Sequence, residues 1–177
     1  AVQSQSGKLY VILGLSGSGK TTVARELASR TDAVHIRSDA VRKHLAGVPL
    51  NERGGDDLYT PAMGEKTYSR LLELGITLAK AGFTIVLDAK YDRQTLRRQA
   101  LDQAKAANIP LELVHCTAPQ DVLEARLEAR SGDIADATVA VLRQQRLEPL
   151  TEAEQGIAYS IDTTKDVPQQ IAAIVEA

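Results

Sequence analysis

The chain has 177 residues, of which 44% are hydrophobic and 25% charged, and this size and composition fit one globular domain with its own core. The formal net charge is -2 and aromatic residues make up 3%, so the sequence lacks the basic surplus and the stacking residues of a dedicated nucleic-acid-binding protein. The single cysteine, Cys116, excludes an internal disulfide and favours a reducing, cytoplasmic setting, and no stretch approaches the about 20 apolar residues that a membrane helix needs.

Short aliphatic runs alternate with amphipathic segments along the chain. The aliphatic runs predict strands at residues 8–13, 33–37, 83–87, 111–116 and 157–161. The amphipathic segments predict helices at residues 20–29, 39–45, 62–81, 93–107, 119–130, 135–145 and 167–175. This alternation predicts a single α/β domain over residues 1–177, with a parallel sheet covered by helices on both faces.

Residues 46–61 interrupt this alternation with a loop that is long for a compact domain. The segment holds three glycines and two prolines, and loops of this length are often functional. We expect it to shape a substrate site. Its polar candidates are Arg53, Asp56, Asp57 and Tyr59.

Residues 14–21 match the phosphate-loop motif G-x-x-x-x-G-K-S/T at every fixed position, between a predicted strand and a predicted helix. Glycines let backbone N–H groups approach phosphates, the Lys20 ammonium reaches the β and γ oxygens, and the Thr21 hydroxyl ligates Mg²⁺. The residues predicted to bind ATP are Gly14, Leu15, Ser16, Gly17, Ser18, Gly19, Lys20, Thr21 and Thr22. The alternative is a plain Gly/Ser-rich turn, which the flanking strand and helix disfavour.

Asp88 ends the third predicted strand, where ligands of open α/β sheets collect. A carboxylate at this place is predicted to hold Mg²⁺, directly or through water, together with Thr21. The alternative is an aspartate that forms a turn. Ala89 and Lys90 follow, so the glutamate with which a hydrolytic motor activates water is absent. This favours phosphoryl transfer to a bound acceptor.

Asp39 lies between the second strand and the next helix, where a kinase needs a carboxylate to accept or orient the proton of the acceptor hydroxyl. Arg42 and Lys43 follow one turn later and are expected to steady the acceptor or its charge, with Arg42 as the predicted binding residue. The alternative role for this position is helix capping, and Ser38 is available to cap while Asp39 catalyses.

Two arginines, Arg126 and Arg130, are four residues apart and share one helix face just before a break at Ser131-Gly132-Asp133. They predict a lid, over about residues 126–145, that closes on the phosphates during catalysis. The alternative is a solvated face paired with Glu124 and Glu128.

Other charged residues give weaker signals. Arg98, together with Arg93 and Arg97, follows the third strand and is a candidate for acceptor binding, with a solvated helix face as the alternative. The histidines form no ligand pattern and are expected at ordinary strand or surface positions; they are His35, His44 and His115.

The runs GLSGSGKTT, IRSDAVRKHL, TIVLDAKY and EARLEARSG, in this order, resemble the P-loop kinases related to polynucleotide kinase and zeta toxin, which are often named AAA-family ATPases. The resemblance covers roughly residues 9–164. It implies a five-stranded parallel sheet in the order 2-3-1-4-5 with a helical lid, and ATP and Mg²⁺ as cofactors. It also implies a general base at Asp39, a place beside the metal and acceptor for Asp88, and phosphate-binding lid arginines at Arg126 and Arg130.

Lys90 departs from polynucleotide kinases, which often have Asn or Thr two places after the strand aspartate. Together with the absence of a basic surplus, this favours small hydroxylated acceptors over a nucleic-acid end. The phosphate loop and the D-x-x-R of Asp39 and Arg42 are also similar to those of adenylyl-sulfate kinase and gluconate kinase. Similar domains occur fused behind an aminoglycoside phosphotransferase-like domain, which suits a chain that begins without Met.

Two functions are therefore open. The first is an ATP- and Mg²⁺-dependent kinase that transfers the γ-phosphoryl group to a hydroxyl of a small molecule, a nucleotide or a nucleic-acid end. The second is an ATP-binding regulatory switch domain of a larger protein, with weak ATPase activity and a fused or partner domain as its target.

Overall fold

The computed structural model describes residues 7–52, 54–131 and 135–176, of which residues 56, 131 and 135–138 are described by their backbone alone. Five parallel strands form one sheet in the order β2-β3-β1-β4-β5. They are β1 (Leu9–Leu13), β2 (Val34–Arg37), β3 (Ile85–Asp88), β4 (Leu111–Thr117) and β5 (Ala158–Asp162). The predicted α/β fold and strand order are confirmed.

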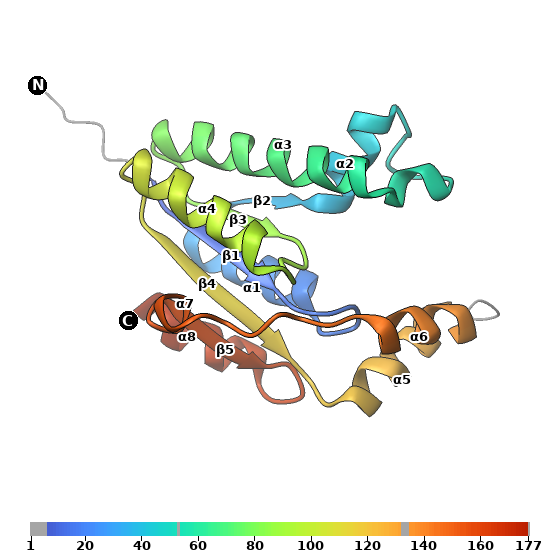
Figure 1. The fold of residues 1–177 in the computed structure, drawn as a ribbon. Coiled ribbons are helices and arrows are strands. Elements are labelled where there is room, and N and C mark those ends of the chain that lie inside the picture. The colour runs from blue at the N-terminus through green and yellow to red at the C-terminus, as the bar shows by residue number, and fades with distance from the viewer. Residues whose placement is uncertain (1–6, 53, 132–134, 177) are drawn as a thin grey trace, which may run out of the picture.

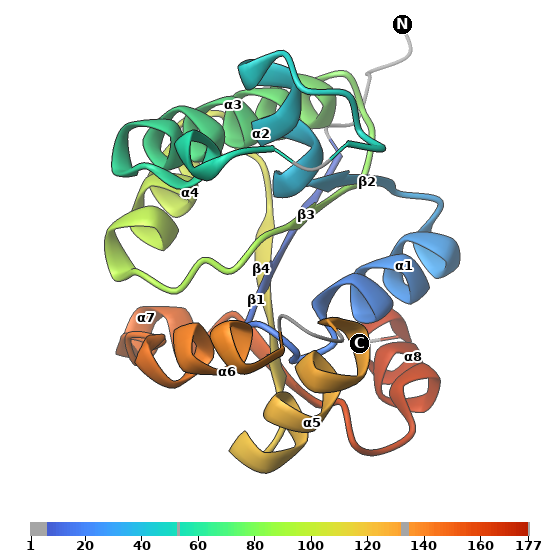
Figure 2. The ribbon, with the colours of Figure 1, turned by 90° about the vertical axis from the view of Figure 1, so that its right-hand side faces the viewer.

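Helices cover both faces of this sheet, with α1 and α8 on one side and α3 and α4 on the other (Figure 1 and Figure 2). The helices are α1 (Lys20–Thr31), α2 (Ser38–Ala46), α3 (Pro61–Lys80), α4 (Gln94–Ala106), α5 (Gln120–Ser131), α6 (Ala135–Gln144), α7 (Glu152–Gln155) and α8 (Val167–Glu176). The predicted ranges of the longer helices agree with these within about two residues. Helix α7 and the 3-10 turn η1 (Asp56–Tyr59) were not predicted, because elements this short carry no periodic signal.

The central strand β1 shows how the two faces are built. Its odd-numbered residues, beginning with Leu9, pack into the core beneath α3 and α4, whereas Tyr10 and Ile12 pack beneath α1 and α8. Every residue of β1 is buried, as expected for a central strand of a parallel sheet. A third, smaller cluster joins α5 to α6; it consists of Leu123, Leu127, Val139 and Leu142. The predicted lid thus has an apolar core of its own.

Because all strands run in the same direction, their carboxyl ends meet at one edge of the sheet, which Figure 2 views end-on. The loop after β1, the start of α2 and the loop after β3 all lie at this edge. Within the described residues, no helix is both long enough and apolar enough to cross a membrane.

Candidate active site

The phosphate loop leaves β1 at Gly14 and enters α1 at Lys20. Gly17 and Gly19 have φ angles of 80° and 87°, and a Cβ on Gly17 would lie 2.8 Å from the carbonyl oxygen of Leu123. The Lys20 ammonium donates a hydrogen bond to the Leu15 carbonyl at 3.1 Å. Burial lowers the pKa of Lys20, and the nearby Asp88 carboxylate opposes this shift. The lysine is therefore held inside the loop, where little water screens its charge.

Thr21 and Asp88, the two predicted Mg²⁺ ligands, are in direct contact. The Thr21 hydroxyl donates to Asp88 Oδ2 at 3.0 Å, and Nε2 of His35 lies 2.9 Å from the same oxygen. Asp88 is only 4% exposed, so its carboxylate is oriented by these contacts. His35 lies in strand β2, as expected, but its contact with Asp88 was not predicted. The signal for its contact lies in the strand order, which places β2 beside β3.

A hydroxyl and a carboxylate oxygen fit the few protein ligands that Mg²⁺ takes when phosphates and waters complete its octahedron. Among the described residues, no three His, Cys, Asp or Glu side chains are grouped closely enough to hold a metal by themselves. Thr21 and Asp88 therefore suit a metal ion whose other ligands come from phosphates and water, and Mg²⁺ at this place stays a prediction.

Beside the phosphate loop lies a cavity of about 570 Å³, a size that accommodates a small-molecule cofactor. Its lining comprises Gly17, Gly19, Lys20, Thr21, Thr22, Arg126, Ala129, Arg130, Thr163 and Val167. The cavity thus joins residues predicted from the phosphate loop to both predicted lid arginines. Thr163, from the loop after β5, was not predicted, because no local motif marks it.

Arg126 is fixed at the wall of this cavity. Its guanidinium donates to the Gly17 carbonyl at 3.0 Å, and to the hydroxyl and carbonyl of Thr163 at 2.8 and 3.0 Å. Glu124 instead pairs with Arg143, so the solvated-face alternative is wrong for Arg126. Arg130 is exposed and lines the same cavity, and its binding of phosphates stays a prediction. Within the predicted lid, residues 132–134 lie outside the described residues.

Asp39 lies in the first turn of α2, with its side chain 61% exposed. Its carboxylate is 3.3 Å from an Arg42 guanidinium nitrogen, and that guanidinium lies 5.2 Å from the centroid of the Tyr59 ring. The loop predicted to shape a substrate site thus reaches Asp39 and Arg42. Ser38 is wrong as the predicted cap, because it is the first helical residue and Arg37 occupies the N-cap position without a side-chain cap bond.

Of the other candidates in that loop, Arg53 lies outside the described residues, and only the backbone of Asp56 is described. Asp57 and Tyr59 are both exposed.

Lys90 is a second cation on this side of the site. Burial lowers its pKa, and the neighbouring charges that affect it include Asp92, Arg42 and Asp39. Asp39 also acts on the pKa of Lys20, so these charged groups share one neighbourhood. The sequence marked Lys90 only as a departure from a pattern. In the structure Arg37 pairs with Asp88, so Asp39 and Lys90 each follow two residues later at the same edge of the sheet.

The two neighbouring arginines of α4 have different environments. Arg98 is exposed, and no hydrogen bond or ion pair of its side chain occurs within the described part of the chain, so its contact with an acceptor stays a prediction. Arg97 is fully buried and bonded to Glu154, and both the acceptor-binding and the solvated-face interpretations are wrong for it.

Comparison with known proteins agrees with this geometry. The family model described as AAA domain matches residues 9–149. An uncharacterized protein of Mycobacterium tuberculosis is 31% identical over 144 residues, which are 79% of this chain but only 29% of that protein. A gluconokinase of Gluconobacter oxydans is 30% identical over 167 residues, covering 90% of this chain and 86% of that enzyme.

Among solved structures, the APS kinase CysC of Mycobacterium tuberculosis shares the fold, with a TM-score of 0.72 and 20% identity over 97% of each chain. The family match spans most of the chain, and a gluconokinase aligns with nearly all of it. The chain therefore belongs to the AAA-domain family.

Proposed function

We propose that this domain transfers the γ-phosphoryl group of ATP, in the presence of Mg²⁺, to a hydroxyl of a small acceptor that carries a negatively charged group. The observation that carries this proposal is the pairing of Arg37 with Asp88 in the register of β2 and β3, which brings the segment with Asp39 and Arg42 and the segment with Lys90 to the same edge of the sheet as the phosphate loop. A carboxylate that can take a proton and two cations that can bind an anion lie next to the phosphate loop.

On the nucleotide side, the backbone of residues 14–21 and the Lys20 ammonium hold the phosphates, and Arg126 and Arg130 form the cavity wall. Thr21 and Asp88 would hold Mg²⁺, which, when bound, neutralises charge on the β and γ oxygens. Positioning and charge neutralisation supply most of the catalysis in phosphoryl transfer, so this arrangement needs no covalent intermediate.

On the acceptor side, Asp39 orients the attacking hydroxyl and accepts its proton. Arg42 keeps Nε buried without a hydrogen-bond partner among the described residues, and the Lys90 ammonium makes no hydrogen bond or ion pair within the described part of the chain. Charge-assisted donors of this kind favour a carboxylate, phosphate or sulfate on the acceptor. The likeness to gluconokinase supports a small acid as acceptor. The finer resemblance to polynucleotide kinase and zeta toxin stays a hypothesis.

The test is an acceptor panel incubated with ATP and Mg²⁺, with phosphorylated product detected by mass spectrometry. The panel pairs gluconate with sorbitol, ribose 5-phosphate with ribose, and adenylyl sulfate with adenosine. We expect product only with the acidic members. Lys90→Met should raise their KM by about 10- to 150-fold, which corresponds to one charge-assisted hydrogen bond.

The matched control is Lys80→Met, because Lys80 is exposed in the last turn of α3, at the other end of the sheet from the site. Equal amounts of product from neutral and acidic members would show that the acceptor needs no negatively charged group, while kinase activity itself would stand. Slow ATP hydrolysis without any product, together with a nucleotide-dependent change in protease sensitivity, would instead support the regulatory switch.

A further inference from the structure

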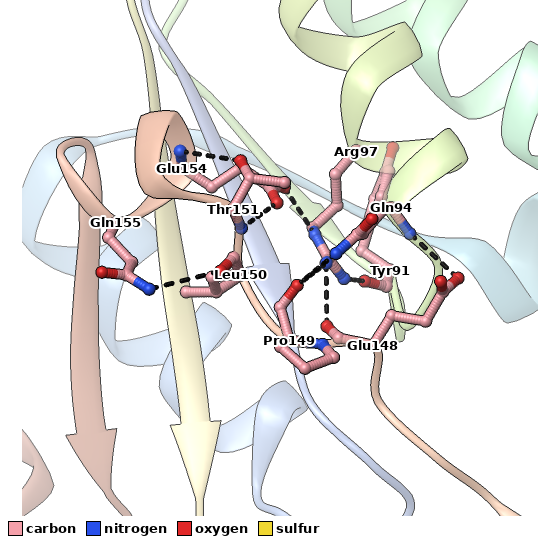
Figure 3. Close-up of polar contacts among 9 residues, drawn as sticks. All are labelled: Tyr91, Gln94, Arg97, Glu148, Pro149, Leu150, Thr151, Glu154 and Gln155. Atoms are coloured by element: carbon pink, nitrogen blue, oxygen red, sulfur yellow. Dashed lines mark hydrogen bonds and ion pairs between the residues drawn. The ribbon is translucent and has the colours of Figure 1, made fainter.

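Arg97 of α4 is 0% exposed and binds three separate parts of the chain (Figure 3). Its Nε donates to Glu154 of α7 at 2.6 Å, and its Nη1 donates to the Tyr91 carbonyl, in the loop after β3, at 2.7 Å. Its Nη2 donates to the carbonyls of Glu148 and Pro149 at 2.8 and 3.1 Å. One guanidinium therefore joins α7, the loop after β3 and the segment that returns from α6.

That returning segment, residues 145–150, is named the strap. It bonds to the loop after β3 beside Arg97 as well, because the Glu148 amide donates to the Asp92 carbonyl at 2.8 Å. The Gln94 side chain donates to the Pro149 carbonyl at 2.7 Å, and the Gln94 amide donates to the Glu148 carboxylate at 3.2 Å. The strap is thus bonded through Glu148 and Pro149 to the loop after β3 and to α4.

Both segments also reach the phosphate loop. At the start of the strap, Gln145 accepts a hydrogen bond from the Ser16 amide at 3.2 Å and donates one to the Ser16 hydroxyl at 3.1 Å. From the loop after β3, the Lys90 carbonyl accepts a hydrogen bond from the Gly14 amide at 3.0 Å. The phosphate loop, the loop after β3 and the strap are therefore joined pairwise into a ring. Arg97 reinforces this ring by bonding the loop after β3 to the strap.

A buried arginine suits this place for a geometric reason. Burial disfavours the Glu154 carboxylate, but hydrogen bonds from Arg97 and the Thr151 amide outweigh it and lower the pKa of Glu154. A buried ion pair gives little net stability compared with apolar residues of equal volume, so stability alone does not explain it. A lysine ammonium lacks the planar fork that lets Arg97 bond outward to several acceptors at fixed angles.

We propose that Arg97 is a positioning residue for phosphoryl transfer, which sets the loop carrying Lys90 and the strap carrying Gln145 in register with the phosphate loop. This inference rests on the proposed function. The two substrates must approach in line, and a displacement of about 1 Å in such a geometry lowers a rate by about 100-fold. Arg97 itself touches neither predicted substrate site.

The test uses Arg97→Lys and the double variant Arg97→Met/Glu154→Leu, which removes both buried charges and leaves the core apolar. Amide hydrogen exchange, read by NMR, reports the ring directly at Gly14 and Glu148, with Val11 in β1 as the internal reference. Transfer is followed with the acceptor found in the panel, and nucleotide affinity with a non-hydrolysable ATP analogue.

Two control variants separate positioning from stability. Ile171→Ala loosens the opposite face of the sheet, and Arg70→Lys changes an exposed arginine on α3. We expect exchange at Gly14 and Glu148 to rise at least about tenfold in both Arg97 variants, with kcat falling by about 10- to 100-fold and nucleotide affinity changing by less than about threefold. Neither control should show this combination.

Unchanged exchange at Gly14 and Glu148, or an equal rise in Ile171→Ala, would overturn the inference whatever the acceptor is. Faster exchange with a wild-type kcat would also overturn it, because the ring would then have no influence on transfer. Should wild-type protein phosphorylate no acceptor, the proposed function fails and the positioning role falls with it. The exchange data would in that case still decide whether Arg97 holds the ring of three segments together.

Discussion

Replacing Lys20 by methionine should weaken nucleotide binding while leaving the nucleotide-free fold intact. The lysine sits inside the phosphate loop, and its ammonium bonds to the Leu15 carbonyl. That carbonyl also accepts a hydrogen bond from the Ser18 amide, so it keeps a partner in the variant. Methionine fills a similar volume without the charge.

The size of each effect follows from the surroundings of Lys20. Loss of a charge-assisted hydrogen bond to phosphate removes about 1.5–3 kcal/mol, which weakens ATP binding about 10- to 150-fold. Burial lowers the pKa of Lys20 below its ordinary 10.5, so the unfolded chain holds this proton more tightly than the folded one. Wild-type stability therefore rises with pH up to about 10.5, and Lys20→Met lacks this rise.

The assays are calorimetry with ATP and Mg²⁺, and urea unfolding of the nucleotide-free protein at several pH values. Near pH 7 the variant should be within about 1 kcal/mol of wild type or more stable, and wild type should gain on it as the pH approaches 10.5. The reasoning would be refuted by a variant that binds ATP as wild type does, or by a stability difference that does not change with pH.

Asp39→Asn should lower transfer by about 100- to 10,000-fold and leave the Kd for ATP unchanged, and a wild-type rate would remove Asp39 as the base. Asp88→Asn should raise the magnesium concentration for half-maximal activity, and an unshifted titration would count against Asp88 as a ligand. Burial raises the pKa of Cys116 to about 12, so iodoacetamide should label the urea-unfolded chain and spare the native one; rapid native labelling would contradict this. Burial opposes ionisation of Glu154, but the hydrogen bonds from Arg97 and Thr151 together outweigh it and lower the pKa below 4.5. The stability advantage over Glu154→Gln should then be present near neutral pH and shrink below pH 4.5, and a gap that stays constant would be inconsistent with that shift.

The sequence alone determined those features that depend on neighbouring residues. The phosphate loop is a continuous run whose glycines, lysine and threonine act through local backbone geometry, so its motif identified it. Alternating aliphatic and amphipathic segments fixed the α/β class, because each period reflects which side of one element is buried. Asp39 and Asp88 became candidate site residues from local pattern too, since each lies at or just after the end of a predicted strand.

Tertiary structure alone decided which distant residues meet. Gln145 and Ser16 are 129 positions apart, and no local spacing links them. Arg97 and Arg98 are neighbours with the same side chain, yet one is buried and the other exposed, because the strap covers only one side of α4. Such contacts depend on how separate elements pack against one another, and a periodic pattern describes only one element at a time.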